Sequence, residues 1–163
     1  MKIATISEIR SELKSIPRDS LEKVCLRLAA FKNDNKALVN YVLFESRDEI
    51  GYINAVKEEM YASFDEMNAS NVYYAKKRIR RILRELKKCI SYSDRKQTEL
   101  ELLISFCQRF IECGSSILEN KVLARTYRKQ IERINKVLDS LHEDERADYS
   151  ESVGKLESHI RDS

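Results

Sequence analysis

The sequence predicts an all-α protein of seven to eight helices packed in antiparallel pairs. Only three glycines and one proline occur in 163 residues, so few positions interrupt a helix. Apolar residues recur at spacings of three and four along most of the chain, and no segment alternates apolar and polar residues as a half-buried strand does. Such helix pairs fit either an irregular bundle or a short superhelix of the HEAT or armadillo kind.

The first two helices are expected on either side of Pro17, which ends one helix and favours the start of the next. Thr5-x-x-Glu8 matches a capping box and places the first helix start near Thr5. The apolar stripe of the first helix is Ile6, Ile9, Leu13 and Ile16. The second helix is expected over residues 18–32, with the apolar stripe Leu21, Val24, Cys25, Leu28 and Phe31. In a stack of helices these stripes pack inward.

The third and fourth helices are also expected to start at polar caps. Asn35 is the expected cap of the third helix, and the short turn before it predicts a hairpin with the second helix. Ser46-x-x-Glu49 matches a second capping box, which predicts the start of a long helix. The inward face of that helix is expected to hold Ile50, Ile53, Val56, Met60, Phe64 and Met67.

The second half of the chain predicts four further helices. A polar break at residues 68–71 precedes a helix that extends to about Ile90 with a near-heptad apolar pattern. The next helix, after residues 91–94, is apolar on more than one face, so we expect it to be central, and Gly114 is placed to end it as a left-handed cap. One helix is expected after residues 115–116, and a last, more polar one begins around Glu143.

Composition limits the class of protein further. The chain is 42% hydrophobic and 35% charged, which is typical of a globular protein, and its length predicts a single helical domain over residues 1–163. Glu8 falls where a signal peptide needs apolar residues, and no apolar run approaches a membrane span, so we expect a cytoplasmic protein that does not enter a membrane. The four cysteines form no Cys-x-x-Cys pair, and we expect reduced core thiols.

The strongest local signal is a basic segment at residues 76–88. It holds eight basic residues and one acidic residue, although the net charge of the whole chain is only +3. On a helix, one broad face of this segment would carry the basic side chains Lys77, Arg80, Arg81, Arg84, Lys87 and Lys88. Such a face could bind an anionic partner, with Tyr73, Tyr74 or Tyr92 stacking on nucleic-acid bases.

Three other interpretations of the basic segment compete with binding of an anionic partner. It could be a solvated helix face, or it could contact a membrane surface. It could also be neutralised within the protein by the preceding helix, at about 47–67. Residues 45–66 carry seven acidic residues against Arg47 and Lys57. These interpretations differ in whether the basic side chains are paired or exposed.

The remaining polar clusters are weaker candidates for a site. Residues 139–163 have a net charge of −5, and Asp144, Asp148 and Glu151 lie about a turn apart, as a weak cation site would need. His142-x-x-Glu145 places two possible ligands on one helix face. Neither pattern reaches the ligand set of a metal centre, and no nucleophile elbow or phosphate-binding glycine loop occurs. We therefore expect no metal, no cofactor, no small-molecule substrate and no enzymatic activity.

Two terminal segments resemble a family of bacterial all-helical proteins of unknown function. At the amino end, the similar residues are the stretch from Ile16 to Leu21, Leu26-x-Leu28, and the stretch from Phe31 to Lys36. At the carboxyl end, the segment from Leu141 to Tyr149 is similar in kind. The resemblance implies a helical or superhelical fold and carries over no functional residues.

The function that this pattern favours is a non-catalytic interaction or scaffold module that binds a protein partner. Polarised charge would steer the encounter between the two proteins. The alternative function is nucleic-acid binding by the basic helix at residues 76–88.

Overall fold

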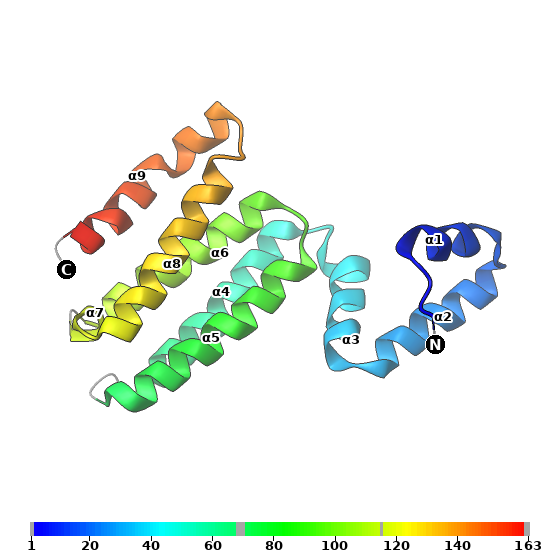
Figure 1. Cartoon of the computed structure of the whole chain (residues 1–163), viewed down its shortest axis with the longest axis horizontal. Helices are drawn as coiled ribbons and strands as arrows, with labels where there is room; N and C mark the ends of the chain where they lie inside the picture. The colour runs from blue at the N-terminus through cyan, green and yellow to red at the C-terminus, as the bar shows by residue number, and fades with distance from the viewer. Residues whose placement is uncertain (1, 68–70, 115, 162–163) are drawn as a thin grey trace. The chain divides into compact units, whose positions relative to one another are not determined.

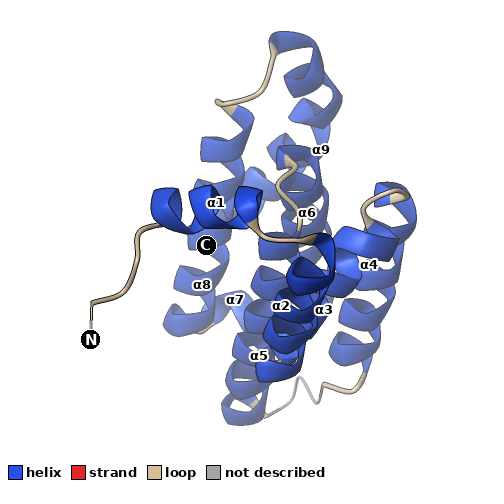
Figure 2. Cartoon of the chain, turned by 90° about the vertical axis from the view of Figure 1, so that its right-hand side faces the viewer, coloured by secondary structure: helices blue, strands red, loops and turns tan. Residues whose placement is uncertain are grey.

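The computed structural model describes residues 2–67, 71–114 and 116–161. Over these ranges the protein consists of helices joined by short turns and contains no strand, so the predicted all-α class is confirmed (Figures 1 and 2). The chain divides into two units, Met1–Phe44 and Glu45–Ser163, and each is described separately. The single domain, and the choice between a bundle and a superhelix, stay predictions.

The first unit begins with two helices separated by Pro17. Helix α1 spans Ile6–Ser15, and its predicted capping box is confirmed. The Thr5 amide donates to Glu8 Oε2 at 2.6 Å, and the Glu8 amide donates to Thr5 Oγ1 at 3.3 Å. Helix α2 spans Arg18–Phe31, and the Pro17 carbonyl accepts the first backbone hydrogen bonds of this helix.

Helix α3 (Asn33–Asn40) starts three residues earlier than a cap at Asn35 predicts. Its cap is Lys32, a single residue with extended backbone that connects α2 to α3. The chain turns at this residue, so α3 runs back at an angle to α2 (Figure 1). The prediction of Asn35 as the cap is wrong. Asn35 lies within the first turn, and its Nδ2 instead donates to the Leu28 carbonyl at 2.9 Å. A π-helical turn, Tyr41–Glu45, follows α3.

The predicted inward faces of α1, α2 and α3 are not buried. None of the three helices contains a buried residue. Ile6, Leu28 and Phe31 have exposed fractions of 74%, 54% and 75%. These helices are amphipathic as predicted, but three short helices enclose too little volume to cover their apolar stripes.

The second unit begins with helix α4 (Glu49–Asp65). The predicted capping box at Ser46 is wrong: the cap is Asp48, whose Oδ1 accepts from the Gly51 amide at 2.9 Å. Gly51 permits this contact, because a Cβ there would lie 2.4 Å from Asp48 Oδ2. The buried face also differs, since Ile50 is exposed and Tyr52 is buried in its place.

Helix α5 (Val72–Tyr92) is followed by α6 (Lys96–Glu112), which lies at the centre of this unit. Asn71 caps α5 by accepting from the amides of Tyr73 and Tyr74. The predicted central position of α6 is confirmed, because it packs against α4, α5, α8 and α9. It buries residues on several faces, and Phe106 stacks between Phe64 and Phe110 at centroid distances of 5.6 and 5.8 Å.

Three helices complete the unit. The predicted left-handed end of α6 is confirmed by φ = 110° at Gly114. The single helix predicted after residues 115–116 is in fact two, α7 (Ser116–Glu119) and α8 (Lys121–Leu138), because Asn120 caps α8; Ser115 lies outside the described residues. Helix α9 spans Glu143–Arg161 and packs on α8 and α6.

Candidate nucleic-acid interface

Helix α5 separates its apolar and basic residues onto opposite sides, as the sequence predicts. Its buried residues are Ala75, Ile79, Ile82, Leu83 and Leu86. Residues advance by about 100° along a helix, so Lys77, Arg84 and Lys88 lie nearly opposite that buried stripe. Lys77, Arg80, Arg81, Arg84 and Lys87 are exposed, and Lys88 is half-buried. The six predicted residues therefore share one broad outward face.

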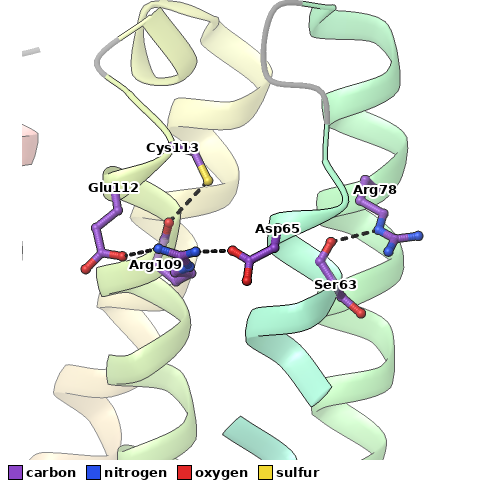
Figure 3. A network of polar contacts seen from close by, with 6 residues as sticks. All are labelled: Ser63, Asp65, Arg78, Arg109, Glu112 and Cys113. Carbon is purple, nitrogen blue, oxygen red and sulfur yellow. Dashed lines mark hydrogen bonds and ion pairs between the residues drawn. The ribbon is translucent and has the colours of Figure 1, made fainter. Parts of the chain in front are cut away.

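Among the described residues, most of this basic face is not paired with the acidic helix α4. One ion pair between the acidic and the basic segments is made by Arg78, which lies outside the predicted face and pairs with Glu66 just after α4. Arg78 Nε also donates to the Ser63 carbonyl at 2.9 Å (Figure 3). Arg84 and Lys88 each form an ion pair with Glu85 of their own helix, at 3.3 and 3.5 Å.

Other acidic side chains near α4 are paired with different helices. Asp65 accepts from Arg109 of α6, which also donates to Glu112 at 2.7 Å (Figure 3). Glu49 accepts from Ser93 Oγ at 2.7 Å. Within the part of the chain that the structure describes, Lys77, Arg80, Arg81 and Lys87 form no ion pair. This outcome favours an exposed basic face over the predicted alternative of internal neutralisation.

The structure adds a second basic helix that the sequence analysis missed. Helix α8 carries six basic residues and one acidic residue, Glu132. The basic residues are all exposed: Lys121, Arg125, Arg128, Lys129, Arg133 and Lys136. They are dispersed among uncharged residues and form no run like that of residues 76–88. A charge count over each amphipathic segment would have revealed them.

Residues of α5 and α8 line a groove along this side of the unit. One part, of about 550 Å³, is lined by Arg80, Arg84 and Lys87 of α5 and by Lys129 of α8. The adjoining part, of about 710 Å³, shares Lys87 and Lys129 and extends to the start of α6. The two parts together are lined by nine basic and three acidic residues, so the groove attracts anions.

An aromatic pair lies at the amino end of the basic face. Tyr73 and Tyr74 are 72% and 61% exposed, and their rings meet edge to face at a centroid distance of 5.6 Å. Both line a hollow of about 670 Å³ together with Lys77, Arg80 and Arg81. Exposed aromatic rings beside arginine and lysine are the groups on which unpaired bases stack.

The weaker candidate sites differ from a catalytic or metal centre. Glu145 Oε2 accepts from the His142 backbone amide at 3.4 Å, so these two residues form a helix-start contact. Glu151, of the acidic stripe on α9, pairs with Lys155 at 2.7 Å. Among residues 2–67, 71–114 and 116–161, no group of three or more His, Cys, Asp or Glu side chains is arranged to hold a metal ion.

Three of the four cysteine thiols are poorly placed for nucleophilic chemistry. Burial raises the pKa of Cys107, Cys89 and Cys113. A raised pKa keeps the sulfur in its unreactive protonated form at neutral pH. The fourth thiol, Cys25, is exposed on α2.

Comparison with known proteins yields no match to any family model, curated protein or solved structure. The resemblance to a family of bacterial helical proteins therefore stays a prediction. No helix in the described ranges is both long enough and apolar enough to cross a membrane.

Proposed function

We propose that the chain is a non-catalytic helical interaction module that binds a protein partner through the apolar stripes of α1 and α2. The observation that carries this proposal is the exposure of those stripes. Ile9 and Leu13 on α1, and Val24 and Leu28 on α2, are at least 39% exposed. Exposed apolar residues that recur along a helix are the usual anchors of a helix-in-groove or helix-on-helix interface.

The charge of the first unit indicates the chemistry of the partner. Residues 1–44 carry eight basic and five acidic residues. Basic side chains such as Arg10, Lys14 and Arg27 are exposed on the same two helices. A partner with an apolar helical face and acidic margins would match both features, because opposite charges at the rim increase the rate and specificity of association.

Site-specific photo-crosslinking in cells that naturally express the chain tests this function. A photoreactive phenylalanine replaces Phe31 in the apolar stripe of α2, and the matched control replaces Lys23, an exposed residue of the same helix outside the stripe. The proposal expects an adduct with one protein species from position 31 and none from position 23. An adduct with a second copy would identify the partner as the chain itself.

Two results would overturn this proposal. One is equal labelling from positions 31 and 23, because it would show that the stripe has no preferred contact. The other is an adduct within the same chain, because residues 45–163 would then cover the stripe themselves.

A second candidate function, nucleic-acid binding, is supported by the exposed basic face of α5. Four of its six predicted residues, Lys77, Arg80, Arg81 and Lys87, are exposed and form no ion pair within the described residues. Unpaired cations at successive turns release counterions when they meet phosphates, which is the main source of affinity for nucleic acids. Fluorescence anisotropy with labelled oligonucleotides across a salt titration tests it.

A further inference from the structure

We infer that α5 and α8 together form a binding track for a single-stranded nucleic acid. This inference rests on the second candidate function and adds to it the other wall of the site and the form of the ligand. The phosphates would contact the basic side chains of both helices, and the bases at one end would stack on the exposed rings of Tyr73 and Tyr74.

The first support is the continuity of positive charge across the groove. Arg80, Arg84 and Lys87 line it from α5, and Lys129, Arg133 and Lys136 line it from α8. Within the described ranges, Lys129 and Lys136 have no acidic partner. A backbone lying along the groove would therefore meet cations on both sides, whereas binding to α5 alone would use one row.

The second support is the spacing of the cations. Arg80, Arg84 and Lys87 follow one another at intervals of four and three residues, and Lys129, Arg133 and Lys136 repeat the same intervals. Residues at these intervals lie about 5–6 Å apart on a helix surface. The stretch from Tyr73 to Ser91 of α5 covers about 27 Å, long enough for several nucleotides. The track thus presents repeated contacts to a repeating polyanion.

The aromatic pair favours a single strand over a duplex. Tyr73 and Tyr74 are the two most exposed aromatic side chains of the described part of residues 45–163. They line the same hollow as Lys77 and Arg81, and their rings are held at an angle to each other. A base within a duplex is already stacked on its neighbours, so only unpaired bases gain from these rings.

The carboxylates in the groove do not cancel its charge. Glu99 is engaged by Arg133 through two hydrogen bonds, which neutralises one cation and one anion together. The other two acids lining the groove are Asp94 and Glu132. The charge that remains is strongly positive, and it lies on α5, on α8 and at the start of α6.

Fluorescence anisotropy on the full chain tests the track. The probes are a labelled single strand of about 12 nucleotides, within the usual range of site sizes, and a duplex of the same length. The variants are Arg84→Ala on α5, Lys129→Ala on α8 and Tyr73→Ala, with Lys23→Ala on α2 as a matched control outside the groove. Circular dichroism verifies that each variant keeps its helices.

The expected results concern salt dependence and base stacking. For Arg84→Ala and for Lys129→Ala, log K should fall less steeply with log salt, with a slope smaller in magnitude by about 0.7. This is the change expected when one phosphate contact on a single strand is lost. Tyr73→Ala weakens binding of the single strand about tenfold without changing that slope. Lys23→Ala binds like the wild type, and the duplex binds more weakly than the single strand.

Each contrary result has a distinct meaning. If Lys129→Ala binds like the wild type while Arg84→Ala is weakened, α5 binds alone and the track is wrong, although the second candidate function survives. If the duplex binds as tightly as the single strand and Tyr73→Ala has no effect, the preference for a single strand is wrong. Absence of binding at low salt would reject both the second candidate function and the track.

Discussion

Arg133 holds Glu99 through two parallel hydrogen bonds, of 2.6 Å from Nε to Oε1 and 2.8 Å from Nη2 to Oε2. This fork joins α8 to α6 at the wall of the groove. Only 17% of the Glu99 side chain is exposed, so few water molecules can reach the carboxylate to replace the hydrogen bonds that Arg133 donates. Hydrogen bonding to Glu99 raises the pKa of Arg133, so the guanidinium stays charged.

We predict that Arg133→Lys lowers the free energy of unfolding by about 1 kcal/mol, at the upper end for partly exposed ion pairs. Lysine keeps the positive charge but cannot make two parallel hydrogen bonds. Urea denaturation of the single variants Arg133→Lys and Glu99→Gln and of the double variant measures the coupling between the two residues. Strictly additive effects would show that the fork contributes no stability.

Removing the negative charge of Glu99 from the Arg133–Glu99 pair should increase the affinity for nucleic acid. Glu99→Gln releases the Arg133 guanidinium into the groove and removes one negative charge there. We expect single-stranded oligonucleotides to bind several-fold more tightly and the salt slope to steepen by about 0.7. The matched control is Glu22→Gln, an exposed position on α2. Equal gains from Glu22→Gln and Glu99→Gln would indicate a general charge effect with no role for the groove.

Two glycines are predicted to respond in opposite directions to alanine. Gly114 has φ = 110°, where a side chain is strained, so Gly114→Ala should destabilise the protein by about 1–2 kcal/mol. Gly154 lies inside α9, and an added Cβ would meet nothing within 4 Å, so Gly154→Ala should stabilise it by about 0.5–1 kcal/mol. Urea denaturation of each variant measures the two shifts; the same sign at both positions would contradict the backbone argument.

The four cysteine thiols should react with a labelling reagent in the order of their exposure, with the most exposed thiol first. Cys25 is exposed, Cys89 and Cys113 are half-buried, and Cys107 is fully buried in α6 with a raised pKa. We expect a thiol-reactive disulfide reagent to modify Cys25 first and Cys107 only through global unfolding, because a buried protonated thiol is unreactive. Mass spectrometry of digested samples over time assigns each site. Early modification of Cys107 would indicate local opening of α6.

Alkaline pH should destabilise the fold partly through Tyr127. This side chain is buried, and its hydroxyl donates to the Leu156 carbonyl at 2.9 Å, which ties α8 to α9. Burial raises its pKa, so the folded state keeps the neutral phenol while the unfolded chain ionises near pH 10. The contribution of Tyr127 to stability is therefore complete below about pH 10 and declines as the pH rises above it.

The matching variant is Tyr127→Phe, which removes the ionisable hydroxyl. At neutral pH it should be less stable than the wild type by about 1 kcal/mol, because one hydrogen bond is lost. Above about pH 10 the difference should narrow, since the unfolded variant gains nothing from ionisation at this position. Urea midpoints measured across this pH range give the comparison, and a constant difference would show that Tyr127 does not contribute to the alkaline loss.

The first residues of the helices show where a local sequence pattern predicts the structure correctly and where it does not. Thr5 and Glu8 form the predicted capping box because both partners lie within one turn of each other. At the next box, Glu49 instead accepts from Ser93 and Thr98, which lie more than 40 residues away along the chain. Asp48 therefore caps α4 instead of Ser46. A capping rule considers only residues within one turn, so it does not include the distant contacts of Glu49.

Some residues of the candidate site could likewise be predicted from the sequence, and others could not. The outward position of Lys77, Arg84 and Lys88 was predictable, because the helix period alone places them opposite the apolar stripe of α5. The participation of Lys129 and Arg133 was not, because they lie on α8 and reach the groove only through the packing of α5 and α8 around α6.

The sequence by itself determined the all-α class, most helix boundaries and the two faces of α5, because these depend on residues within a few turns of one another. The tertiary structure decided which charges are paired, that α8 shares a groove with α5, and that the stripe containing Leu28 and Phe31 is not buried. Burial and ion pairing depend on contacts between segments distant in sequence, and helical periodicity carries no information about those contacts.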